Sequence, residues 1–541
     1  MYIERITRKL GKKQYVTTLI RDSYREGKKV KHHTLANLSR LPKHVVQNIE
    51  NWIRQPSLCF EKLQQLSIES SREYGASYAF MELARQLELD KIIYSRKKQW
   101  REDVLAMVIG RLVYQGSKLH LTHLYRDSVL WELCGYHENT YPNVEEHCYE
   151  ALDLLLKRQS AIQKELAKRH LKNGCLILYD ITSSYVEGEY EDSDLVAFGY
   201  SRDKKKGHEQ IVIGLLANDE GCPIAVKVFR GNTSDQTTVL EQAQRLVNDY
   251  QVKDVIFVGD RGMLTAKRIE EVNALGYKTL TALSHVQLRE LSQREALTPY
   301  QFNSEHIQEV LDPDDKSVRY FLCKNPEKAQ EDTNTRNQLI AKTQAALEKI
   351  TKSKKRNAQK KSAQVGKILA QYKVGKFFQW SVNDNNELSF QIDNEKKLVE
   401  ERFDGCYVIR TDSALDKEQA VKSYKGLACV ERAFRNLKTV SLEIRPIYHH
   451  LDNRIRAHVF LCMLAYYVEW HAIQRLKPLF KADGTGAGRR WSFARVVERL
   501  KSICIQNCRL NGMEIPNVIT TPDQEQQKIL DLLKCSQSRE S

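Results

Sequence analysis

The most constraining feature of this sequence is a change in the spacing of its apolar residues over residues 174–283. Upstream of this segment, apolar residues recur at the three- and four-residue spacing of helices, whereas here they form short runs typical of β-strands. The runs 175–179, 210–216 and 223–229 predict three strands, and a turn at 218–221 joins the last two as a hairpin. The spacing therefore predicts a three-stranded antiparallel meander.

Helix and strand patterns alternate after this meander. A helix is predicted from a cap at Ser234 to Tyr250, followed by a strand at 255–258, a helix at 265–275 and a strand at 278–280. The resulting order is βββαβαβ. This order predicts an α/β fold in which helices cover both faces of a mixed sheet.

Two aspartates stand where predicted strands of this unit end. Asp180 follows the first strand and Asp260 follows the fourth, and parallel neighbouring strands would bring those ends together. Glu431 lies on a later amphipathic helix, near the basic residues Arg435 and Lys438. Carboxylates are the ligands that Mg²⁺ and Mn²⁺ prefer, and two such ions can hold both oxygens of an in-line phosphoryl displacement. We therefore predict that Asp180, Asp260 and Glu431 are catalytic and bind two Mg²⁺ (or Mn²⁺) ions.

An ordinary structural role is the alternative for each acid taken singly. Aspartates at strand ends commonly form turns, and most glutamates on helices face solvent. The combination of the strand order, the acids after the first and fourth strands and a third acid on a later helix favours the metal site. Asp412 and Asp416 are alternative candidates for the third acid.

The charge of the chain indicates its partner. Its 541 residues carry a formal net charge of +16, which favours binding to a polyanion such as DNA. The longest apolar run, Val459–Val468, is shorter than the roughly 20 residues that a membrane-spanning helix needs. Charged residues at Glu4 and Arg5 interrupt any secretory signal. We expect a cytoplasmic protein, associated with the nucleoid, without a membrane partner.

The length and the changes of pattern divide the chain into several regions, because one hydrophobic core rarely serves 541 residues. The predicted regions are a basic β-rich N-terminal region (1–58), a helical DNA-binding or dimerisation region (59–172), the first part of a catalytic domain (173–283), an insertion domain (284–403), the second part of the catalytic domain (404–476) and a C-terminal helical region (477–541).

Sequence blocks around the three acids resemble the DDE transposases of bacterial insertion sequences, in the insertion-sequence-four-like group. Tyr179–Ser184 resembles the first-acid block and Gly259–Met263 resembles the second. The third block of that family spaces a tyrosine, an arginine, a glutamate and a lysine along a helix. Tyr424, Glu431 and Lys438 match that spacing here.

This resemblance covers most of the chain and implies its fold and activity. It continues through residues 199–205, 230–235 and 445–449. It implies an RNase H-like catalytic domain, interrupted by an insertion domain between Asp260 and Glu431. It also implies a transposase that cleaves DNA strands at transposon ends and transfers them into target DNA, acting as a homodimer on the terminal inverted repeats.

The resemblance and the basic helix face together suggest which side chains contact DNA. The expected DNA-binding residues are Tyr424, Lys438, Arg435, Arg261 and Arg445. Leu427 stands where the family has its arginine, which removes one expected contact and leaves the assignment of the acids intact.

Two other functions are compatible with these patterns. An RNase H-fold nuclease would cut DNA without joining it. A sequence-specific DNA-binding protein derived from a transposase would keep the basic surface without catalysis. The presence of all three acids argues against the second, and cleavage and joining assays separate the three functions.

Overall fold

The computed structural model describes residues 1–10, 13–54, 66–137, 140–203, 205, 207–303, 306–352, 357–383, 385–440, 442, 444–482, 490–510 and 513–535. These residues fall into two compact units. The first unit combines 1–82, 123–141 and 478–541, and the second combines 83–122 and 142–477.

The first unit contains a sheet formed by the N-terminal strands. The strands are β1 (Tyr2–Leu10), β2 (Lys13–Glu26) and β3 (Lys29–Asn37), and α1 (Lys43–Arg54) follows them. The three strands pair antiparallel in the order β1-β2-β3. Gly27 adopts a φ of 63° in the turn between β2 and β3, a conformation that glycine tolerates best.

The first unit also contains a sheet whose strands come from opposite ends of the sequence. It has the order β16-β15-β4. Its strands are β4 (Leu66–Glu73), β15 (Cys504–Leu510) and β16 (Met513–Ile519). The regions 59–172 and 477–541 were predicted to be helical, and these strands correct that prediction. The reason is long-range pairing: β4 forms its backbone hydrogen bonds with β15.

Besides α1, ten helices precede residue 172 or follow residue 451 in the described part of the chain. They are α3 (Gly75–Gln86), α4 (Leu89–Ile93), α5 (Gln99–Val113), α6 (Lys118–His123), α7 (Leu130–Leu133), η2 (Val144–Tyr149), α8 (Glu150–His170), α17 (Asp452–Ala482), α18 (Phe493–Lys501) and α19 (Gln524–Leu533). Within the described residues, no helix combines the length and apolar character needed to cross a bilayer.

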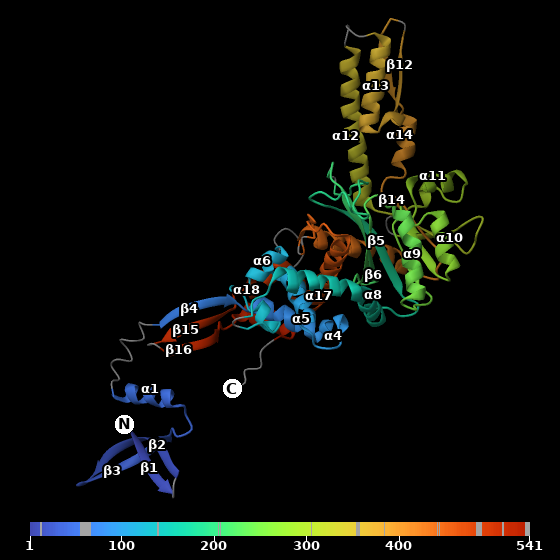
Figure 1. Ribbon diagram of the computed structural model, residues 1–541. Coiled ribbons are helices and arrows are strands. Elements are labelled where there is room, and N and C mark those ends of the chain that lie inside the picture. The colour runs from blue at the N-terminus through green and yellow to red at the C-terminus, as the bar shows by residue number, and fades with distance from the viewer. Residues whose placement is uncertain are drawn as a thin grey trace. The chain divides into compact units, whose positions relative to one another are not determined.

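In the described chain, the largest sheet has eight strands in the order β10-β11-β14-β9-β8-β5-β6-β7. They are β5 (Leu176–Tyr185), β6 (Gln210–Asn218), β7 (Pro223–Arg230), β8 (Ile256–Val258), β9 (Lys278–Ala282), β10 (Gln308–Leu311), β11 (Arg319–Lys324) and β14 (Cys406–Thr411). β5, β6 and β7 form the antiparallel meander, and β8 and β9 run parallel to β5. With α9 (Asp235–Asn248) and α10 (Ala266–Ala274) between the later strands, this confirms the βββαβαβ order and the RNase H-like α/β fold (Figure 1).

The segment between β9 and β14 both extends this sheet and projects from it. It comprises α11 (His285–Gln293), η3 (Pro299–Gln301), β10, β11, α12 (Pro326–Thr351), α13 (Ala358–Tyr372), η4 (Gly375–Phe377), β12 (Phe378–Val382), β13 (Leu388–Ile392) and α14 (Asn394–Glu401). β11 pairs with β14, so part of the segment belongs to the large sheet. Figure 1 shows α12 and α13 side by side, projecting away from that sheet.

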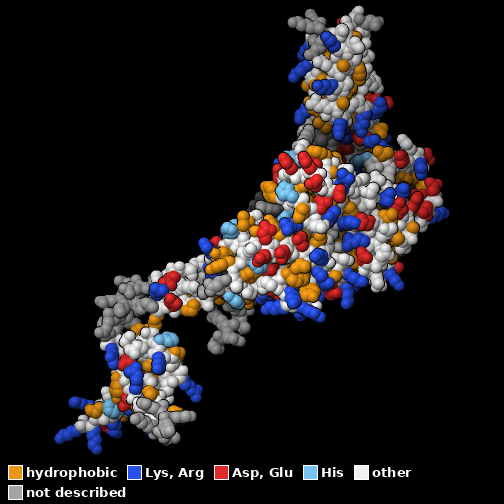
Figure 2. All heavy atoms as spheres, in the orientation of Figure 1, with side chains coloured by type: hydrophobic (Ala, Val, Ile, Leu, Met, Phe, Trp, Pro, Cys, Tyr) orange, Lys and Arg blue, Asp and Glu red, His pale blue; other side chains and the backbone are white. Residues whose placement is uncertain are grey.

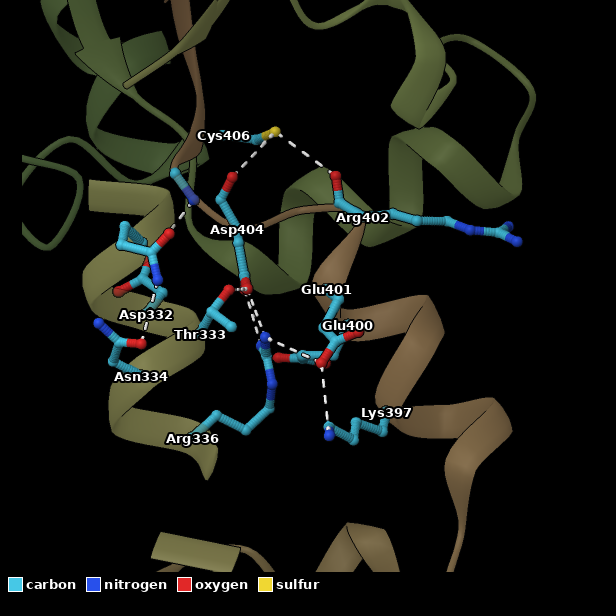
Figure 3. A network of polar contacts seen from close by, with 12 residues as sticks. Asp332, Thr333, Asn334, Arg336, Lys397, Glu400, Glu401, Arg402, Asp404 and Cys406 are labelled. Carbon is cyan, nitrogen blue, oxygen red and sulfur yellow. Dashed lines mark hydrogen bonds and ion pairs between the residues drawn. The ribbon is translucent and has the colours of Figure 1, made fainter. Parts of the chain in front are cut away.

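A buried ion pair joins the base of this projection to the chain that enters β14. Arg336 on α12 donates from Nη1 to Asp404 Oδ1 at 2.7 Å and from Nη2 to Oδ2, and the Thr333 hydroxyl donates to the same carboxylate at 2.7 Å. Figure 3 shows these side chains converging. Both charged residues are 8% exposed, and Arg336 also forms a longer ion pair with Glu401 at 3.6 Å, so two carboxylates stabilise its buried charge.

Candidate active site

The sheet brings Asp180 and Asp260 together. β5 and β8 are parallel neighbours, and their register aligns Leu178 with Val258. Asp180 and Asp260 each lie two residues after this aligned pair. The prediction that parallel neighbouring strands bring the two positions together is therefore confirmed.

The setting of Asp180 differs in one respect from the prediction. The strand does not end before it, because β5 continues to Tyr185 through its pairing with β6. Only the pairing with β8 ends before Asp180, and this opens one side of the strand at that residue. Asp260 does follow its strand, and its carbonyl accepts hydrogen bonds from the N–H groups of Met263 and Leu264 in the following turn.

Glu431 reaches the same place from a helix. It lies on α16 (Leu427–Arg435), which packs against β5 through a buried face that includes Val430 and Phe434. A cavity of about 400 Å³ lies where these elements meet. Its lining residues are Asp180, Ile181, Thr182, Arg202, Asp235, Asp260, Met263, Glu431, Phe434, Arg435, Lys438 and Arg445. All three predicted acids therefore line one cavity.

The electrostatics of Asp180 reflect this convergence. Burial raises the pKa of Asp180 to about 7, the N–H of Ile181, which donates to its carboxylate at 2.8 Å, opposes the rise, and the carboxylates of Asp260 and Glu431 add to it. Tyr424, on α15 (Lys417–Lys425), has a pKa raised to about 12 by burial and by the same acids. Such repulsion among carboxylates is what a bound cation would relieve.

The three carboxylates are too far apart for all of them to bind one ion as they stand. Within the described residues, the three carboxylates do not form a group whose ligand atoms all lie within 4.8 Å of one another. Two ions roughly 3.5–4 Å apart can be shared by carboxylates that are more widely spaced. Oxygen donors of this kind suit hard divalent cations, so the residues present fit such a pair.

Cationic side chains line the same cavity as the acids. Asp203, whose side chain is 5% exposed, accepts from Lys438 Nζ at 2.8 Å and from Arg445 Nη1 at 2.5 Å. Arg202 forms an ion pair with Asp235. Burial lowers the pKa of Lys438, which lies in the π-helical segment η5 (Asn436–Val440) after α16. The predicted residues Lys438 and Arg445 are thus fixed at the acid cavity by an acid that the sequence analysis did not select.

The remaining predicted residues fall into two groups. Arg435 lines the cavity, and Arg261 lies close enough to Tyr424 to influence its pKa. Leu427, in contrast, is 8% exposed and belongs to the buried face of α16. Its position on the core side explains why an apolar residue is accommodated there.

The alternative third acids have structural roles. Asp412 accepts a hydrogen bond from the backbone N–H of Thr279 at 2.6 Å. Asp416 caps the N-terminus of α15 and accepts from the N–H of Gln419 at 2.7 Å. Neither lines the cavity.

Arg202 and Asp203 were missed as site residues. They lie in the 199–205 block, whose resemblance to the transposases was the available signal. Periodicity could not find them, because they follow β5 in an irregular segment whose position depends on tertiary contacts, such as the bond from the Arg202 N–H to the Ser183 hydroxyl at 2.9 Å.

An RNase H-like sheet with three carboxylates and several cations around one cavity defines the class of metal-dependent enzymes that act on nucleic-acid phosphodiesters. Residues 172–468 match the transposase DDE domain, and residues 3–56 match the N-terminal domain of IS1634 family transposases. The chain belongs to the DDE transposases. It is therefore a DNA transposase of the bacterial insertion-sequence type and depends on divalent metal ions. The predicted family is confirmed, with a match to the IS1634 group that fits the predicted insertion-sequence-four-like group only loosely.

Solved structures give more distant similarities. A piggyBac transposase synaptic complex with hairpin DNA has 7% identity and a TM-score of 0.36, over 79% of this chain and 75% of that one. A Mos1 transposase paired-end complex with the left transposon end has 15% identity and a TM-score of 0.15, over 44% of this chain and 68% of that one. The comparison with curated proteins gave no match.

Proposed function

We propose that Asp180, Asp260 and Glu431 are the catalytic acids of this transposase and that they hold two Mg²⁺ (or Mn²⁺) ions. Their convergence on one cavity, where burial and the neighbouring carboxylates raise the pKa of Asp180 to about 7, is the observation that supports this proposal. The ions would stabilise the attacking and leaving oxygens during strand cleavage and strand transfer.

The cationic side chains that line the cavity have a complementary role in this proposal. Arg435, Lys438 and Arg445 orient the scissile phosphate toward the acids, and Tyr424 and Arg261 contact the DNA backbone beside it. Asp203 keeps Lys438 and Arg445 in place before DNA binds. The side chains that hold the phosphate are therefore ordered in advance.

The DNA partner follows from the family and the charge. We propose that the transposase acts as a homodimer on the terminal inverted repeats and on target DNA. Residues 1–170 would provide most of the recognition of the transposon end. The N-terminal sheet supports this role, since Arg25, Lys28, Lys29 and Lys31 are exposed on it, and Figure 2 shows Lys and Arg side chains at its surface.

The catalytic assignment is tested with purified Asp180→Asn, Asp260→Asn and Glu431→Gln variants. Each should lose cleavage and joining in Mg²⁺ and in Mn²⁺, because a ligand charge that holds the ions is removed. Each should keep end binding, because the loss of a negative charge reduces repulsion of the DNA phosphates. Asp416→Asn is the matched control, since asparagine caps a helix as well as aspartate does, and it should keep full activity.

The outcomes separate the possible functions. Substantial cleavage by Asp180→Asn or Asp260→Asn would reject the assignment. If Asp416→Asn loses activity and Glu431→Gln retains it, Asp416 is the third catalytic acid in place of Glu431. A wild-type protein that cleaves but does not join pre-cut ends is a nuclease, and one that only binds ends is a DNA-binding protein.

A further inference from the structure

A second group of metal-ligating side chains lies in the second unit, outside the acid cavity. His170 ends α8, Cys222 lies in the turn between β6 and β7, and His471 lies on α17. One ligand atom from each of these residues lies within 4.8 Å of those of the other two. None of the three lines the acid cavity. Three elements far apart in the sequence thus present two imidazoles and a thiol to one point.

The turn holds Cys222 in a fixed position. The N–H of Cys222 donates to the Asn218 side-chain oxygen at 2.8 Å, and the N–H of Asn218 donates to the Cys222 carbonyl at 3.1 Å. Gly221 adopts a φ of 83°, which closes the turn. Cys222 is 0% exposed, so its thiol is buried in the protein interior.

The two histidines are prepared to act as ligands. Nε2 of His170 forms a hydrogen bond with the Tyr467 hydroxyl at 2.9 Å, and this type of outer bond orients a ligating imidazole. Nε2 of His471 is buried and has no hydrogen-bond partner among the described residues. Burial lowers the pKa of both imidazoles, which favours the neutral form that binds metal.

We propose that His170, Cys222 and His471 bind a zinc ion. A thiolate with two imidazoles is a borderline-soft ligand set that suits zinc and does not suit Mg²⁺. Ligand atoms at roughly 2.0–2.3 Å from one ion lie somewhat closer together than 4.8 Å, so small side-chain rotations complete the site. Water completes the fourth position, and Tyr467 remains the outer partner of His170.

Zinc at this point would fasten α8, α17 and the β6–β7 turn to one another. Binding converts the Cys222 thiol to a thiolate and releases its proton to solvent, so the affinity rises with pH. The ion takes no part in the reaction proposed for the acids, and the inference does not rest on that proposal. Its role is to stabilise the packing of α8 and α17 against the β6–β7 turn, which belongs to the sheet that carries Asp180.

The test measures the zinc content of the purified full-length protein after dialysis against metal-free buffer. Wild type should hold about one zinc ion per chain, and Cys222→Ala and His471→Ala should hold about tenfold less or lower. Cys175→Ala, which changes a half-buried cysteine outside the group, should keep its zinc. Asp180→Asn should also keep it, which separates this ion from those at the acids.

A second measurement covers variants that fold poorly. Wild-type protein freed of metal and titrated with Co²⁺ should develop a thiolate-to-cobalt charge-transfer absorption, and zinc should displace it. Tyr467→Phe should weaken zinc binding about tenfold, as expected for the loss of an outer partner. Absence of both zinc and the absorption in folded wild type, or equal zinc in wild type and Cys222→Ala, would overturn the proposal.

Discussion

Replacing Asp180 by asparagine should abolish catalysis and yet stabilise the metal-free protein at alkaline pH. The pKa of Asp180 in the folded protein, about 7, lies above its ordinary value of 3.8. The folded state therefore favours the protonated acid, and its stability falls as pH rises from about 4 through about 7. At about 1.36 kcal/mol for each pH unit, the full effect is about 4 kcal/mol at pH 8, of which about 3 kcal/mol develops between pH 5 and pH 8.

The assay compares thermal unfolding of wild type and Asp180→Asn in EDTA at pH 5 and at pH 8. Effects of the substitution that do not depend on pH cancel between the two conditions. The advantage of the variant should grow by up to about 10 °C, since 1 kcal/mol shifts Tm by roughly 2–4 °C in a domain of 150–250 residues. Mg²⁺ at pH 8 should raise the Tm of wild type and leave that of Asp180→Asn unchanged.

The control is a buried acid that already has a partner. Asp404→Asn leaves buried Arg336 with its longer ion pair to Glu401 at 3.6 Å, and it should lower stability by about 3 kcal/mol at both pH values. If the Tm difference between Asp180→Asn and wild type is the same at pH 5 and pH 8, burial and the neighbouring carboxylates do not raise the pKa of Asp180 in the folded protein. The raised pKa of Asp180 would then no longer support a metal site at the three acids.

Three further predictions concern the cations at the cavity, the buried face of α16 and the affinity for DNA. Asp203→Asn should release Lys438 and Arg445 and lower single-turnover cleavage about 100-fold while end binding persists; equal cleavage would exclude a positioning role. Leu427→Arg should reduce Tm and soluble yield because it buries an unpaired charge, whereas Leu427→Met should not. Affinity for end DNA should fall about 1,000-fold between roughly 50 and 200 mM salt, measured by fluorescence anisotropy, and a flat response would exclude extensive phosphate contact.

The parts of the fold that the sequence could predict depend on local pattern. Strands β5 to β9 have apolar runs of strand period separated by clear turn and cap residues, so their order could be derived. The adjacency of Asp180 and Asp260 followed from two parallel strands being neighbours. Both inferences need only short segments and one general rule of sheet geometry.

The parts that could not be predicted depend on pairing between distant segments. β4 alternates weakly and lies near helices, and only its partner β15, more than 400 residues later, makes it a strand. β11 joins the large sheet because β14 lies beside it after a long projection. The environment of Lys438 was hidden for the same reason, since Asp203 lies 235 residues before it.

The charges around the cavity link metal binding to DNA binding. Among the described residues, four acids and four cations line it, so the metal-free cavity has little net charge to attract a phosphate. Two divalent ions would add four positive charges beside the cations that are already in place. Phosphate would then enter a site whose lysine and arginine are ordered by Asp203 and whose acids are neutralised by metal. Replacing one acid by an amide therefore reduces the repulsion among the carboxylates. It does not improve catalysis, because the lost charge belongs to a ligand that holds the ions.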